Sequence, residues 1–146
     1  LLFLIVWTWQ VTHWQGGMLW FGLALIFSLL GDIALMLNPR YFMVGLSAFL
    51  IAHLNFLVGF NQQPPPLTIG SLLIALLVGI SAARVLKTLR PGVMKVPRGK
   101  RFLTAVLFYG VTLALMVLSA LITTFRADWQ LSHALLVSVG AILFYI

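Results

Sequence analysis

Residues 20–37 read WFGLALIFSLLGDIALML and residues 42–60 read FMVGLSAFLIAHLNFLVGF, with only the turn Asn38-Pro39-Arg40-Tyr41 between them. Each apolar run is close to the roughly 20 residues that an α-helix needs to cross a bilayer. Pro39 interrupts the helical pattern, because proline lacks the backbone N–H that a helix interior requires. This stretch therefore predicts two membrane-spanning helices joined as an antiparallel hairpin.

Further apolar runs lie on both sides of this hairpin. Polar or proline-rich interruptions separate them, notably residues 61–66 and 90–92, and we expect the fourth run to end at 90–92. The predicted segments are a partial one at 1–9 and full spans at 20–37, 42–60, 67–89, 102–124 and 129–146. Continuous apolar runs favour helices over β-barrel strands. We therefore expect an all-α, polytopic transmembrane bundle that forms a single domain over residues 1–146, with about five full spans plus a partial one.

The composition excludes several other classes of protein. Hydrophobic residues make up 62% of the 146 residues, charged residues make up 8%, and the mean hydropathy is +1.12. A soluble domain has about 25% charged residues, so this chain lacks the polar surface of a soluble enzyme or a disordered segment. The chain contains no Cys, which excludes disulfides, zinc–thiolate sites and cysteine nucleophiles.

The basic residues predict the orientation in the membrane. Seven of them lie at one junction, namely Arg84, Lys87, Arg90, Lys95, Arg98, Lys100 and Arg101, and Arg40 falls on the same side if the spans alternate. By the positive-inside rule, connections 38–41 and 90–101 are cytoplasmic, and connections 10–19, 61–66 and 125–128 face outward. This signal accounts for the net charge of +7, so we expect the lipid bilayer and no nucleic acid as a partner. The expected location is a bacterial inner membrane, and the sequence leaves the oligomeric state open.

Both ends of the chain lie inside apolar runs. Leu1 is not an initiator Met, and residues 134–146 contain no closing polar group. We therefore interpret the chain as a fragment, and expect that groups needed for its chemistry, such as a second catalytic acid, lie beyond its ends.

Two ionisable residues, Asp32 and His53, lie inside the predicted spans of the hairpin, where such a group costs about 2.5–3.5 kcal/mol to insert. Asp32 has no Lys or Arg within two turns of its own helix, and Gly31 beside it allows a partner to approach closely. We expect Asp32 to act as a general acid or as a carboxylate that stabilises a cation. His53, near the middle of the next helix, is either a second catalytic group or a hydrogen-bonded packing residue, and both interpretations remain open.

Other polar residues are candidates for substrate binding. They are Tyr109 and Asn55 inside spans and Arg40 at the cytoplasmic rim, where its charge suits a phosphate. Most such in-span groups hold helices together, as the small pairs Ala48–Ala52 and Gly110–Ala114 also do. The three His residues occupy separate segments, so we expect no metal and no cofactor.

The hairpin also resembles a known family. It contains Ser28-Leu29-Leu30-Gly31-Asp32-Ile33-Ala34-Leu35 and, after the short turn, Phe42-x-x-Gly45-Leu46-x-Ala48-Phe49-x-x-Ala52-His53-Leu54. These motifs resemble the YhhN family of membrane proteins, which includes the mammalian lysoplasmalogenases, and the later Tyr109, Met116 and Ala120 are similar to its weaker pattern. The resemblance covers most of the chain, and the Gly-Asp and Ala-His-Leu motifs are its specific part.

The resemblance implies about eight helices in the complete protein. It also implies hydrolysis of the vinyl-ether bond of a lysoplasmalogen, a membrane lysophospholipid, to a fatty aldehyde and a glycerophospho-head group. Asp32 matches the first aspartate to which the family's catalysis is ascribed, and a second is implied in a Ser-Asp motif just past Ile146. Phe56 replaces a tyrosine that many relatives carry, which argues against a binding role for this position.

Two other function classes remain open on the sequence alone. A small-solute or proton-coupled transporter would use Asp32 and His53 as a proton relay. A non-catalytic scaffold would use them for packing. The sequence has no evident internal repeat, a feature that many carriers have.

Overall fold

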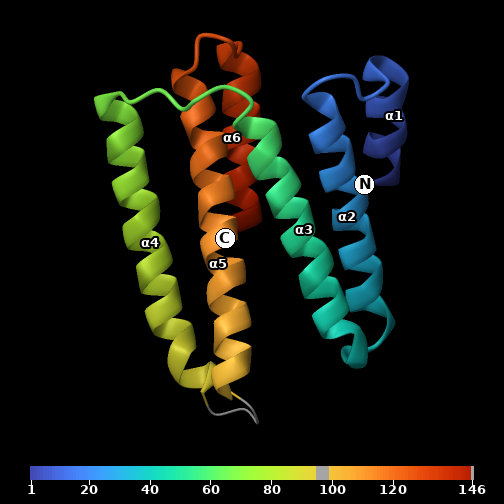
Figure 1. Ribbon diagram of the computed structural model, residues 1–146, viewed down its shortest axis with the longest axis vertical. Coiled ribbons are helices and arrows are strands. Elements are labelled where there is room, and N and C mark those ends of the chain that lie inside the picture. The colour runs from blue at the N-terminus through green and yellow to red at the C-terminus, as the bar shows by residue number, and fades with distance from the viewer. Residues whose placement is uncertain (95–98, 146) are drawn as a thin grey trace. The chain divides into compact units, whose positions relative to one another are not determined.

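The computed structural model describes residues 1–94 and 99–145, with side chains described for 1–94 and 103–145. All regular secondary structure in these residues is helical, which confirms the predicted all-α class. The elements are α1 (Leu2–Thr12), α2 (Met18–Leu37), η1 (Pro39–Tyr41), α3 (Phe42–Phe60), α4 (Ile69–Val93), α5 (Gly99–Ile122), η2 (Thr123–Phe125) and α6 (Leu131–Tyr145). They belong to two compact units, Leu1–Gln63 and Pro64–Ile146, which are described separately below (Figure 1).

The helix bounds follow the predicted segments most closely in the hairpin, where α3 begins and ends as expected. The predicted end of the fourth run at residues 90–92 is wrong, because α4 continues through Pro91 to Val93. Pro91 lies in the last turn, so the helix loses only the bond that its N–H would have made. The next N–H groups still find acceptors, since the Met94 N–H donates to the Arg90 carbonyl at 3.1 Å.

Four helical segments of the described residues are long and apolar enough to cross a membrane: Met18–Leu37, Pro39–Phe60, Ile69–Val93 and Leu103–Phe125. The predicted span at 129–146 is shorter than expected, because residues 127–129 form a turn and α6 has 15 residues. Large apolar side chains cover the outer faces of these helices, and Ile69, for example, is 80% exposed. Such faces are stable against hydrocarbon, which agrees with the predicted membrane location.

In the first unit, α2 and α3 form an antiparallel hairpin that turns at η1 (Figure 1). Pro39 occupies the first position of η1, where its missing N–H is not needed. The Oδ1 atom of Asn38 accepts a hydrogen bond from the Arg40 backbone N–H at 3.1 Å. The two residues that interrupt the apolar pattern therefore also build the turn.

Glycines bring α2 and α3 into close contact and fix their register. In three places a glycine of one helix lies directly against a side chain of the other: Gly31 against Phe49, Gly45 against Leu35, and Gly59 against Phe21. In each pair the two residue numbers add to 80. Asp32 is therefore level with Ala48, whereas His53 is level with Phe27.

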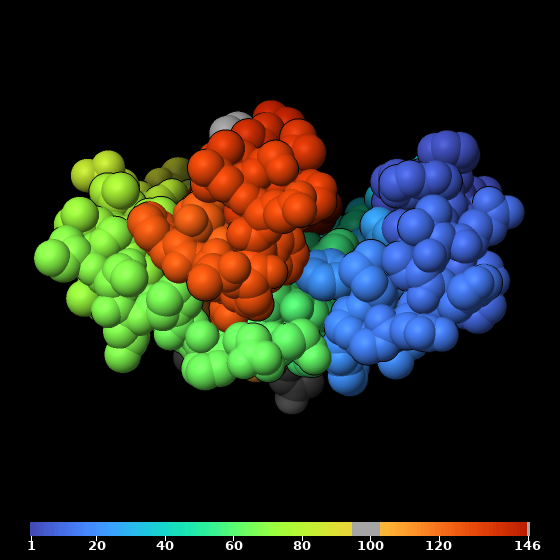
Figure 2. Space-filling model, turned by 90° about the horizontal axis from the view of Figure 1, so that it is seen from above, coloured from blue at the N-terminus to red at the C-terminus, as the bar shows by residue number. Residues whose placement is uncertain are grey.

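The connection between α1 and α2 has an unusual backbone. His13, Trp14 and Gly16 have φ values of 47°, 49° and 58°, a left-handed region that non-glycine residues rarely adopt. The Trp14 indole lies over Gly22, where any Cβ would collide with it, and its Nε1–H donates to the Thr8 hydroxyl at 3.2 Å. The atoms of this connection (blue) form one continuous surface with the adjoining ends of α1 and α2 in Figure 2.

In the second unit, α4 and α6 both pack against α5. The N-terminus of α4 is closed by a capping box, in which Thr68 and Ser71 each accept a backbone N–H of the other. The face of α6 toward the core carries the small buried residues Ala134, Ser138 and Ala141. Ser138 donates to the Ala120 carbonyl at 3.3 Å, and the hydroxyls of Ser81 and Tyr145 lie 3.3 Å apart.

Candidate functional site

Asp32 lies on α2, five residues before the helix ends at Leu37. At 1.5 Å per residue this is about 7.5 Å from the end of the helix. Its side chain is half-buried, and it makes no hydrogen bond or ion pair with the side chains described for residues 1–94 and 103–145. The sequence of α2 predicted that Asp32 has no partner in its own helix. The structure shows that α3, which packs against α2, provides no partner either.

His53 lies on α3 and is only 1% exposed. The register places it level with Phe27 of α2, five positions deeper than Asp32. The separation along the helix axis is therefore about 7.5 Å, too far for a direct hydrogen bond between short side chains.

Helical periodicity places both residues on the same flank of the hairpin. A helix turns by about 100° per residue, so Asp32 lies about 100° around α2 from Gly31, and His53 lies about 80° around α3 from Gly45. The glycines face the partner helix, and because the helices are antiparallel, rotations of the same sign lead to the same side. We call this side, which carries Asp32 and His53, the acidic flank.

The other two hairpin candidates lie elsewhere. Asn55 is two residues after His53 and so points about 160° away from it, on the opposite side of α3. Its Nδ2 group donates to the Ile51 carbonyl of the same helix at 2.8 Å. Arg40 lies in η1, exposed at the end of the hairpin and four residues before Val44.

Tyr109 belongs to the second unit, where it lines a cavity of about 140 Å³ between α4, α5 and α6. Gly110 and Tyr145 line the same cavity. The structure therefore does not place Tyr109 in the hairpin that carries Asp32 and His53, and its role in substrate binding stays a prediction.

Several expectations concern residues that carry little structural description. Lys95 and Arg98 lie outside the described residues, and only the backbone is described for Lys100 and Arg101. The positive-inside orientation, which depends on these residues, stays a prediction. In the part of the chain that the structure describes, no three His, Asp or Glu side chains gather closely enough to hold a metal ion.

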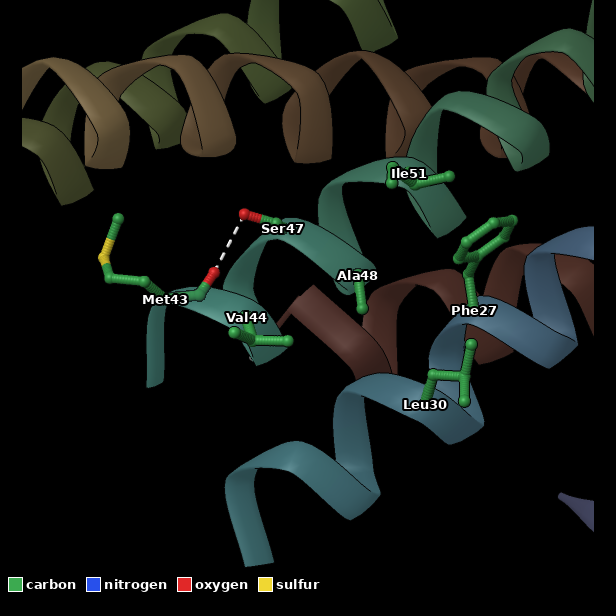
Figure 3. Close-up of a pocket in the computed structure, with 7 residues that line it drawn as sticks. All are labelled: Phe27, Leu30, Met43, Val44, Ser47, Ala48 and Ile51. Atoms are coloured by element: carbon green, nitrogen blue, oxygen red, sulfur yellow. Dashed lines mark hydrogen bonds between the residues drawn. The ribbon is translucent and has the colours of Figure 1, made fainter. Parts of the chain in front are cut away.

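The sequence missed two features that the structure shows. Arg126, expected in an outward loop, is only 7% exposed, and its Nη1 lies 3.5 Å from the Pro64 carbonyl oxygen. An apolar groove also runs along α2 and α3 on the side opposite the acidic flank (Figure 3). The sequence gave no sign that Arg126 contacts the Pro-rich stretch, because the two are 62 positions apart. The groove depends on how α2 and α3 rotate against each other.

Long apolar helices with exposed apolar faces define the class: this is a multi-pass helical membrane protein. An isolated carboxylate and a buried imidazole on one flank of a helix pair are its distinguishing groups. The family model of the YhhN family matches residues 1–146, so the chain belongs to the YhhN family. No curated protein and no solved structure matches the chain at a significant level.

Proposed function

We propose that this chain forms part of a membrane-embedded hydrolase that cleaves the vinyl-ether bond of lysoplasmalogens. The observation that carries the proposal is the isolation of Asp32, which makes no ion pair or hydrogen bond in the described residues although it lies inside an apolar span. A charged side chain at the centre of a span costs about 2.5–3.5 kcal/mol to insert, and ionisable groups inside spans are rare and usually functional. Membership of the YhhN family supports a catalytic use for it.

The reaction requires an acid first and water second. Protonation of the alkene carbon that is not bonded to oxygen gives an oxocarbenium ion, in which the ether oxygen shares the positive charge. Water adds to the cationic carbon and loses a proton, which gives a hemiacetal. The hemiacetal then breaks its bond to the glycerol oxygen, and the products are a fatty aldehyde and a glycerophospho-head group.

Asp32 suits the first part of this sequence. As a general acid it donates the proton to the alkene carbon, and as a carboxylate it stabilises the cation that results. Its depth of about 7.5 Å below the end of α2 suits a bond that lies just beneath a lipid head group. His53, farther along the acidic flank, is proposed to hold the water that captures the cation.

Tyr109 remains a proposed substrate contact, and the second carboxylate that the family resemblance implies also remains a proposal. Asn55 is not included, because it points away from the acidic flank. These assignments make Asp32 the group whose removal is decisive.

The test compares the two acidic residues of this chain in the complete protein, reconstituted in lipid. Asp32→Asn keeps the volume and removes both the proton and the negative charge, so it is expected to abolish aldehyde release from a lysoplasmalogen. Asp128→Asn is the matched control, since Asp128 is exposed in the turn before α6. Full activity of purified Asp32→Asn protein would end the catalytic assignment.

A proton-coupled carrier is the second candidate, favoured by the position of Asp32 and His53 on one flank about 7.5 Å apart along the axis. In sealed proteoliposomes a carrier would move protons with its solute and release no aldehyde. Aldehyde release without proton movement would favour the hydrolase.

A further inference from the structure

A groove opens along the hairpin on the side opposite the acidic flank. Its volume is about 540 Å³, within the range of about 300–1,000 Å³ that is usual for small-molecule sites. It lies wholly within the first unit, and its walls come from α2 and α3: Phe27, Leu30, Met43, Val44, Ser47, Ala48 and Ile51 (Figure 3).

The walls suit a hydrocarbon occupant. Six of the seven lining side chains are apolar. The exception is Ser47, whose hydroxyl donates to the Met43 carbonyl at 2.8 Å and so is satisfied within its own helix (Figure 3). A polar ligand would lose its hydration in this groove and gain little in return.

The length and depth of the groove match one leaflet of a bilayer. Met43 lies in the first turn of α3 and Ile51 lies eight residues farther on, which is about 12 Å along the helix. Half of a hydrocarbon core of about 30 Å is about 15 Å. A chain in the groove would therefore run from the membrane interface nearly to the bilayer centre.

A positive charge lies at the shallow end of the groove. Arg40 precedes Val44 by four residues and is exposed in η1. The N-terminus of α3, which begins two residues later, adds the positive end of its helix dipole there. The apolar wall and the positive end together have the polarity of a phospholipid in this leaflet.

We propose that this groove binds one hydrocarbon chain of an anionic phospholipid, with the lipid phosphate at Arg40. The binding does not depend on the proposed reaction, because Asp32 and His53 lie on the acidic flank and not on the groove side. Loss of lipid binding and loss of aldehyde release are therefore separate outcomes.

The experiment uses the complete protein in nanodiscs of phosphatidylcholine that contain a minor fraction of phosphatidylglycerol with a diazirine on its chain. After irradiation, mass spectrometry locates the cross-linked residues. Cross-links are expected to concentrate on the groove residues. Ala48→Phe fills the groove and is expected to lose them, whereas Ala83→Phe, at an exposed site of α4, is expected to keep them.

A second pair of variants tests the charge. Arg40→Gln is expected to remove the advantage of unlabelled phosphatidylglycerol over phosphatidylcholine as competitor, and Arg90→Gln, at an exposed site near the end of α4, is expected to leave it intact. Ser47→Leu is a milder filling variant that keeps the test valid if Ala48→Phe folds poorly.

Two results would overturn the proposal. Equal cross-linking of the groove and of other exposed apolar residues would show that the groove only meets bulk lipid. Absence of groove cross-links, with disulfide formation by Ser47→Cys in this Cys-free chain, would show that a second copy covers the groove instead.

Discussion

Gly45 faces the backbone of Gly31 across the hairpin, so closely that a Cβ on Gly45 would lie 3.3 Å from the Gly31 carbonyl oxygen and 2.7 Å from Leu35 Cδ2. A carbonyl oxygen in a helix cannot move aside as a flexible side chain can. The distance between α2 and α3, and with it the position of Asp32 beside Gly31, therefore depends on the absence of a side chain at residue 45.

Gly45→Val is accordingly expected to destabilise the folded protein by about 1–3 kcal/mol through overpacking. Gly79→Ala is the control, because a Cβ at Gly79 meets nothing within 4 Å, and this change should be neutral or stabilising by up to about 1 kcal/mol. Thermal unfolding in detergent measures both. Equal behaviour of the two variants would contradict the close packing of α2 and α3.

Asp32→Leu should separate catalysis from packing. The half-buried carboxylate makes no bond in the described residues, so an apolar side chain is expected to leave the thermal midpoint unchanged or raise it. Aldehyde release should nevertheless be lost. A marked fall in the midpoint would instead indicate that Asp32 holds the fold together.

His53→Ala should destabilise the protein by about 2–4 kcal/mol, because a side chain that is 1% exposed leaves a cavity when it is truncated. His133→Ala, at an exposed site of α6, should change the free energy of unfolding by less than about 0.5 kcal/mol. Both values come from unfolding in detergent. His53→Leu, which largely refills the space, then tests the proposed water-holding role, and unchanged aldehyde release in that variant would leave His53 with packing alone.

Thr68→Ala should cost about 1 kcal/mol, since it removes the side-chain acceptor for the Ser71 N–H at the start of α4. Thr88→Ala changes the same residue type within the same helix, where the hydroxyl only donates to the Arg84 carbonyl. The loss should appear as faster amide exchange at residues 69–72. Equal exchange in the two variants would refute the capping role.

The sequence was sufficient for most of the helix bounds and for the isolation of Asp32. Asn38 and Pro39 end α2 and build the turn through their own backbone preferences, so their effect is local. Pro91 shows the limit of this reasoning, because a proline in the last turn costs one hydrogen bond and does not fix the final residue. The sequence alone could not show that Asp32 and His53 share one flank of the hairpin. That conclusion requires knowing which faces of α2 and α3 meet, and the contacts of Gly31, Gly45 and Gly59 identify those faces.

Burial was harder to predict than helicity. Arg126 has the sequence context of a solvated loop residue, yet the fold buries it, and one of its contacts is with Pro64, 62 positions away. The groove likewise follows from the relative rotation of α2 and α3, which no single helix encodes. Asn55 illustrates the same difficulty. Its place inside a span suggested a binding role, but it lies on the side of α3 opposite His53.

The contact between Ser81 and Tyr145 has a consequence for biosynthesis. The two hydroxyls are 64 positions apart, and the chain between them includes α5 and most of α6. A ribosome must therefore release nearly all of the second unit before this contact forms, whereas α2 and α3 are able to pair as soon as their short turn has left the insertion machinery. The helix pair that carries Asp32 is thus expected to mature first in the membrane, and the surroundings of Tyr109 are expected to mature last.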